Sequence, residues 1–174
     1  MSLDLYIESK TPIRHRNSGI YIRDEGETRI LESKEEVLKY FPNINSDEIN
    51  ITSYEDNIYF HMNLTHNLTE MASKCNIIGL CNHNSNEDST VISLYDLLWH
   101  PKDNLNIEVP SFNYLEDIIA CYRKLSENAN FFKQYNPING WGTYEQLVRR
   151  TKNYINALIK ISDSFENYKI ETSV

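Results

Sequence analysis

Residues 58–75 read Ile-Tyr-Phe-His-Met-Asn-Leu-Thr-His-Asn-Leu-Thr-Glu-Met-Ala-Ser-Lys-Cys, and the spacing of their hydrophobic side chains changes midway. Residues 58–64 carry the aromatic and apolar residues typical of a strand. From Leu68 the apolar side chains recur at positions i, i+3, i+4 and i+7, which is the spacing of an amphipathic helix. Thr65 or Asn67 is expected to cap that helix. The chain is therefore predicted to change from strands to helices near residue 65.

The residues before this change predict an antiparallel sheet. Apolar and polar side chains alternate over residues 3–8, as in a half-buried strand. The turn-forming cluster at residues 24–27 is flanked by isoleucines and predicts a hairpin. Residues 49–54 and 58–64 are predicted as two further strands, which gives a four-stranded meander. A capping box at residues 33–36 opens one short inserted helix.

The residues after this change predict about four helices and a last strand. Helical spacing or capping signals cover residues 65–75, 91–99, 111–128 and 143–161. Alternating apolar side chains at residues 167–173 predict a closing strand that returns to the sheet. The expected fold class is α+β, with an N-terminal antiparallel sheet of about four strands packed against about four helices.

Length and composition predict a single domain over residues 1–174. Residues 1–64 are expected to be mainly strands and residues 65–164 mainly helices. A chain of 174 residues lies below the length at which domains usually split. Hydrophobic residues make up 40% of the chain, which is enough for a core without disulfides or metals.

Charge and targeting signals narrow the classes of partner. The net charge is −8, with 25 acidic and 17 basic residues and no long basic run, so nucleic acid is not expected as a partner. The three cysteines give no disulfide framework, the N-terminus lacks the features of a signal peptide, and no apolar run is long enough to cross a membrane. A cytoplasmic protein with no membrane partner is expected. A homodimer is compatible with the sequence, which leaves the oligomeric state open.

Two helix starts are the clearest candidates for a binding site. They lie at residues 63–68 and 136–143. The first turn of a helix leaves N–H groups unpaired and carries the positive end of the helix dipole, so it favours an anion. A tryptophan between two glycines could stack on a base. If the two starts converge, they would form a nucleotide-type pocket whose ligand-binding residues are His66, Asn67, Trp141 and Tyr144. In the alternative reading, these residues are ordinary helix caps and a core anchor.

The sequence gives less support to the hypotheses of a metal site and of a catalytic site. Cys75, Cys81 and His83 lie close together in the sequence, but their spacing differs from that of structural zinc sites, and Cys75 falls on an apolar helix face. A hydrolase would use His66 with Glu70, although Glu70 is more simply a first-turn carboxylate. Nucleophile-elbow, phosphate-loop, dinucleotide-binding and zinc-protease motifs are absent. No metal, cofactor or catalytic residue is predicted.

Three segments carry a resemblance to a known group. They are Asn63–Ala72, Tyr95–Pro101 and Phe132–Glu145. Across residues 60–160 the chain resembles a group of small uncharacterised bacteriophage and prophage proteins with T-H-N-L-x-x-M-A, L-W-R-P and N-G-W-G-x-Y-E segments. His100 stands where that pattern has arginine, and residues 75–90 look like an insertion. The resemblance implies a phage or prophage setting in a host cytoplasm and implies no reaction.

The expected function is that of a non-catalytic binding module. It would sequester a small anionic, nucleotide-like molecule or inhibit a host protein. The alternatives are a small hydrolase or phosphodiesterase that uses His66, and a purely structural or interaction protein in which the signature residues serve packing.

Overall fold

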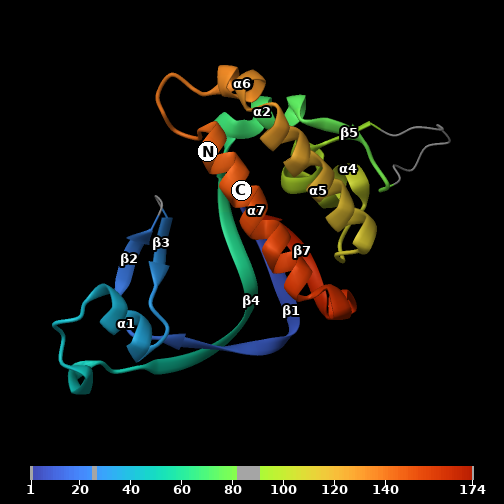
Figure 1. Cartoon of the computed structure of the whole chain (residues 1–174). Coiled ribbons are helices and arrows are strands. Elements are labelled where there is room, and N and C mark those ends of the chain that lie inside the picture. Colours follow the sequence, from blue (N-terminus) through green and yellow to red (C-terminus); the bar gives the residue numbers. More distant parts are fainter. Residues whose placement is uncertain (1, 25–26, 82–90, 174) are drawn as a thin grey trace. The chain divides into compact units, whose positions relative to one another are not determined.

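The computed structural model describes residues 2–24, 27–81 and 91–173. The chain forms two compact units, a larger one of residues 1–10 and 58–174 and a smaller one of residues 11–57. Helices and an antiparallel sheet occur together, which confirms the α+β fold class (Figure 1). Whether the chain behaves as a single domain stays a prediction.

The sheet of the larger unit has the strand order β4-β1-β7. Strand β1 (Ser2–Asn17) is central, β4 (Thr52–Thr65) lies on one side, and β7 (Tyr168–Ser173) lies on the other. Strands β1 and β7 pair antiparallel, in a register that runs from Asp4 opposite Ser173 to Ser9 opposite Tyr168. The predicted closing strand is therefore confirmed.

The predicted four-stranded meander is wrong in its pairing. Residues 49–54 and 58–64 do not form two strands joined by a turn, because residues 52–65 are one continuous strand. The Glu55-Asp56-Asn57 cluster looks like a turn, yet its side chains are compatible with extended backbone. Asp56 forms an ion pair with His15 of β1 at 3.0 Å, which favours the extended form. The predicted hairpin exists, but it forms a separate two-stranded sheet.

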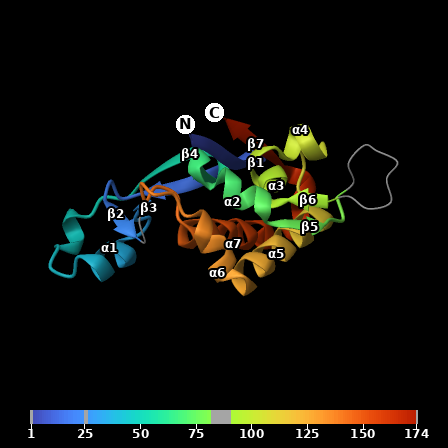
Figure 2. The ribbon, with the colours of Figure 1, turned by 90° about the horizontal axis from the view of Figure 1, so that it is seen from above.

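Helices cover one face of the larger unit's sheet, which we call the inner face (Figure 2). The two long helices, α5 and α7, lie side by side. The helical segments are η2 (His66–Leu68), α2 (Thr69–Lys74), α3 (Leu94–Trp99), α4 (Pro101–Leu105), α5 (Phe112–Glu127), α6 (Ala129–Phe132), η3 (Lys133–Tyr135), α7 (Tyr144–Lys160) and η4 (Ser162–Asn167). The last helix begins at the predicted capping box, with Thr143 as its N-cap.

The helix predicted over residues 91–99 begins later than expected. Residues 91–93 form the short strand β6, which pairs with β5 (Asn76–Ile78). Val91 and Ile92 are β-branched and fit a strand, and Ser93 then caps α3. Residues 91–93 also fit the helical spacing of the residues that follow, so the spacing alone could not locate the start of the helix.

The core of the larger unit includes a buried pair of tyrosines. Tyr114 of α5 donates a hydrogen bond from its hydroxyl to the Leu97 carbonyl at 2.8 Å. The hydroxyl oxygens of Tyr114 and of Tyr154 in α7 are 3.0 Å apart. Burial raises the pKa of both Tyr114 and Tyr154. Because each buried hydroxyl has a partner, the two long helices can bury their polar groups at low cost.

The smaller unit packs a hairpin against a short helix. Strands β2 (Tyr21–Asp24) and β3 (Glu27–Ile30) pair antiparallel. Helix α1 (Lys34–Tyr40) follows, and Ser33 accepts a hydrogen bond from the Glu36 N–H as predicted for its cap. The 3-10 turn η1 (Ser46–Glu48) precedes the return to β4. The buried hydrophobic residues of its core are Leu31, Val37 and Ile49.

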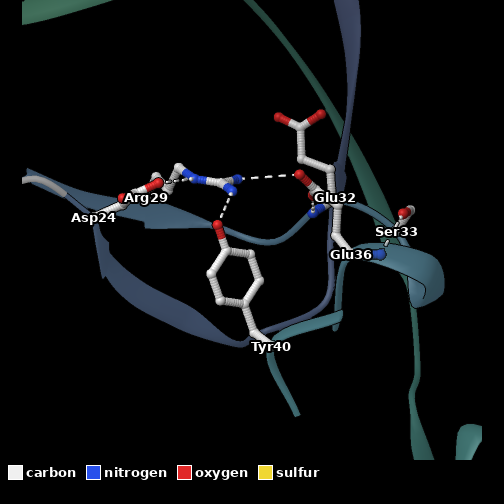
Figure 3. Close-up of polar contacts among 6 residues, drawn as sticks. All are labelled: Asp24, Arg29, Glu32, Ser33, Glu36 and Tyr40. Atoms are coloured by element: carbon white, nitrogen blue, oxygen red, sulfur yellow. Dashed lines mark hydrogen bonds and ion pairs between the residues drawn. The ribbon is translucent and has the colours of Figure 1, made fainter. Parts of the chain in front are cut away.

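Arg29 connects the hairpin to the helix in this unit, as Figure 3 shows. Its guanidinium donates to a Glu36 carboxylate oxygen at 3.1 Å and to the Tyr40 hydroxyl at 3.2 Å. The second Glu36 oxygen accepts from the Glu32 N–H at 2.8 Å. This backbone hydrogen bond and then Arg29 lower the pKa of Glu36. The lowered pKa means that the ionised Glu36 carboxylate stabilises the unit more than the protonated carboxyl does.

We predict that Glu36→Gln weakens the smaller unit at neutral pH and not at low pH. A folded-state pKa below the unfolded value gives stability that is present above the unfolded pKa and lost as pH falls through the folded pKa. The side chain is 37% exposed, so the loss should stay below about 1 kcal/mol. Hydrogen exchange of the amides in residues 27–40, at pH 7 and near pH 3, measures it. The control is Glu32→Gln, since its side chain is exposed. Equal losses in both variants would contradict the prediction.

A candidate binding site at two converging chain segments

The two predicted helix starts meet in the larger unit. The Asn67 side-chain amide donates a hydrogen bond to the Trp141 carbonyl at 3.1 Å. Gly142 lies so close to the start of the first helix that a Cβ atom there would be 2.6 Å from Thr65 Cγ2 and 3.1 Å from Leu68 Cγ. The convergence on which the site hypothesis depended is therefore present.

Local capping positions the first segment. Strand β4 ends at Thr65, whose hydroxyl accepts a hydrogen bond from the Asn67 N–H at 3.4 Å. This cap turns the chain into η2 and then into α2. Leu68 and Met71 are buried beneath the turn, which leaves His66 and Asn67 on its outer side.

Side-chain hydrogen bonds and two glycines shape the second segment. Asn139 accepts from the Trp141 N–H at 3.0 Å, and Asn136 accepts from the Tyr144 N–H at 2.7 Å. Gly140 and Gly142 have φ angles of +71° and +84°, which other residues rarely adopt. The chain therefore reverses on both sides of Trp141 and presents its ring to solvent, with 72% of the residue exposed.

An open hollow of about 590 Å³ lies beside the junction. One carboxylate, that of Glu70, faces this hollow, and no lysine or arginine occurs among its described lining residues. Its lining is rich in amides and hydroxyls and consists of His66, Asn67, Thr69, Glu70, Gln134, Tyr135, Asn136, Pro137 and Ile138. These side chains can donate and accept hydrogen bonds, but none of the described lining residues is a lysine or arginine that could pair with an anion.

The four residues predicted to bind a ligand have different surroundings. His66 and Asn67 line the hollow, and Trp141 is exposed beside them. The alternative of Trp141 as a core anchor is wrong, because its side chain is not buried. Tyr144 is buried and donates its hydroxyl to the Leu125 carbonyl at 2.9 Å, so it supports the site from below.

The start of α7 offers little to an anion. The Tyr144 N–H is bonded to Asn136, and the Gln146 N–H is bonded to the Thr143 hydroxyl at 3.4 Å. Glu145 adds a negative charge at this end of the helix. Lys133, 3.0 Å away, is the main cause of its lowered pKa. The donors and the positive dipole end are therefore satisfied by the chain's own side chains.

The cysteine thiols that were candidates for metal ligands interact with other groups of the protein. The Cys75 thiol donates to the Cys121 carbonyl at 3.3 Å. Burial, followed by a hydrogen bond to Asp117, raises the pKa of Cys81 to about 12, which keeps its thiol protonated. His83 lies outside the described residues. Within residues 2–24, 27–81 and 91–173, no group of three or more metal-ligating side chains occurs.

Sequence reasoning missed Asp117 and the residues of η3. Asp117 is only 2% exposed and accepts hydrogen bonds from the N–H groups of Leu80 and Cys81 at 2.8 and 2.9 Å. It orients the loop after β5 and lies away from the hollow. Gln134 and Tyr135 line the hollow, but no spacing in the sequence places them there. The Asn136-Pro137 turn signal next to them was the available cue.

No protein-family model matches the chain, and no curated protein or solved structure matches it either. None of the described helices is long and apolar enough to cross a membrane. The resemblance to bacteriophage proteins stays a prediction, as does the oligomeric state. The geometry of the two converging segments is therefore the basis for inferring a function.

We predict that Gly142→Ala disrupts the junction and that Gly140→Ala does not. Both substitutions place alanine at a positive φ, which costs about 1 kcal/mol. Only the methyl group at position 142 collides with neighbouring side chains, because open space surrounds position 140. Overpacking of this kind adds about 1–3 kcal/mol to the loss. Equilibrium urea denaturation measures the free energy of unfolding of both variants. Equal losses of this free energy would contradict the prediction, because they would mean that the Thr65 side chain moves aside without cost.

Proposed function

We propose that this protein is a non-catalytic binding module whose contact surface is the hollow together with the Trp141 turn. The observation that carries the proposal is the exposed Trp141 ring on a turn whose backbone is held at both ends. Large aromatic residues exposed on a fixed backbone lose little conformational entropy when a partner covers them. Such residues often dominate the binding energy of an interface.

The surface suits a protein segment better than a small anion. Small-ligand sites are usually enclosed and largely apolar, whereas this hollow is open and lined by amides and hydroxyls. Glu70 would repel phosphate groups, and the start of α7 has satisfied its own donors. Ile138, three positions before Trp141 in the chain, is fully exposed and adds apolar area to the lining of the hollow. Of the two expected partner classes, we therefore favour a protein, which would be a host protein if the phage setting holds.

The fluorescence of two tryptophans provides a direct test. Trp99 is 1% exposed and Trp141 is 72% exposed, so acrylamide should quench mainly the emission of Trp141. A purified partner should protect this emission, and Trp141→Phe should remove the quenchable component. Protection by nucleotides instead of a protein would restore the small-anion alternative and overturn our preference. Conversion of the nucleotide into products would indicate the hydrolase alternative.

We predict that Trp141→Ala weakens partner binding by more than tenfold, since a central aromatic anchor contributes about 2 kcal/mol or more. Isothermal titration with the purified partner measures the affinity. The matched control is Phe112→Ala, which removes another exposed aromatic ring of the same unit. Equal effects of the two variants, with unchanged circular dichroism, would place the contact surface elsewhere.

A further inference from the structure

The two edges of the larger unit's sheet differ in how they are protected. At the β7 edge, the Ile170 N–H donates to the Glu108 carbonyl at 2.8 Å, so another chain segment already pairs there. Lys169 and Glu171 add charged side chains to this strand, in ion pairs with Glu8 and Lys102. Charges and covering segments prevent a strand edge from pairing with other chains.

Among the described residues, no strand pairs with the β4 edge over residues 59–65 and no lysine, arginine or acidic side chain protects it. Only Thr65, at the end of this segment, packs against the turn that contains Gly142. Residues 59–65 read Tyr-Phe-His-Met-Asn-Leu-Thr and contain no acidic residue, lysine, arginine, proline or glycine. Among the strands that the structure describes, none pairs with β4 on the side away from β1. A long, uncharged edge strand with high β-propensity is a template for pairing with a further strand.

We propose that β4 pairs antiparallel with β4 of a second copy of this protein, so that two three-stranded sheets join into one of six strands. The pairing is related by a two-fold axis perpendicular to the sheet, which makes the interface self-complementary and closed. The second edge of each sheet is covered, so association should stop at the dimer. This inference is independent of the proposed contact surface at Trp141.

The side-chain pattern of β4 selects one register. Residues opposite each other in an antiparallel pair point to the same face, so the two-fold axis must pass through a residue. With the axis at Met62, residues 59–65 of one copy lie opposite residues 65–59 of the other, and the inner-face pairs are apolar on both sides. On the inner face Phe60 lies opposite Leu64 and Met62 opposite Met62. On the outer face His61 lies opposite Asn63. At the ends of the pairing Tyr59, whose ring packs against Tyr168 at a centroid distance of 5.3 Å, lies opposite Thr65.

A hollow beside β4 fits this register. It has a volume of about 430 Å³, and α7 forms its second wall. Its lining residues are Tyr59, Phe60, Asn153, Asn156, Ala157 and Lys160. A leucine placed opposite Phe60 would lie over this hollow and cover its apolar part. The helix therefore leaves room for a second strand along the edge.

The outer face of the edge is already ordered. One carboxylate oxygen of Asp4 lies 2.8 Å from His61 Nε2 and accepts from the Asn63 amide at 2.9 Å. The Tyr6 ring stacks on the His61 ring with centroids 4.7 Å apart. Side chains held in this way lose less entropy when a partner strand arrives.

Paired lysines on this edge test the proposal. In the double variant His61→Lys with Asn63→Lys, each new lysine faces a lysine of the other copy, and Asp4 can still accept hydrogen bonds within one copy. Light scattering after size exclusion should give twice the chain mass of 20.5 kDa for the unmodified protein and a single mass for the variant. The control, Ser73→Lys with Ser126→Lys, adds the same charge at exposed positions away from β4 and should remain dimeric.

A charge swap provides the decisive arm. A second variant, His61→Glu with Asn63→Glu, should be monomeric alone and should form a heterodimer when mixed with the lysine variant. Hydrogen exchange supplies a measurement that needs no variant, because amides in residues 59–65 should gain protection as protein concentration rises. A monomeric unmodified protein, or a lysine variant that remains dimeric, would overturn the inference.

Discussion

The central position of β1 is the constraint on which the larger unit depends. It pairs with β7 from the end of the described chain and with β4 from its middle, so the sheet forms only when three distant segments meet. Its inward side chains, among them Leu5 and Ile7, give the helices an apolar surface to cover. The end of β4 then leads directly into η2, which places Asn67 next to the Trp141 turn.

Local chemistry made much of this architecture predictable. Ser33, Thr65 and Thr143 all act as caps at the helix starts where their side chains predicted them, and the closing strand pairs with β1. The errors occurred where local signals permitted two structures. Asp56 fits a turn or a strand, and its ion pair with His15, 41 positions earlier in the chain, favours the strand. No local pattern contains that information.

The candidate site could be predicted only in outline. The glycines around Trp141 indicated an unusual turn, and the convergence with Asn67 follows from tertiary packing that the sequence leaves open. Tyr144 shows the limit most clearly: its place at a helix start suggested a ligand contact, but its hydroxyl is used in the core. A sequence pattern predicts where a residue lies along a helix. The groups that its side chain contacts depend on the neighbouring elements, which the pattern does not describe.

The small core of residues 11–57 has a consequence for local unfolding. Among the described residues of this unit, the buried hydrophobic side chains are Leu31, Val37 and Ile49, and a unit of this size gains little stability from so few apolar side chains. Arg29 and its partners add half-exposed polar contacts, which are weak in water. Proteins open in separate cooperative segments whose free energies follow their buried contacts. The smaller unit should therefore behave as a low-stability foldon that opens and becomes accessible to proteases while the larger unit stays folded.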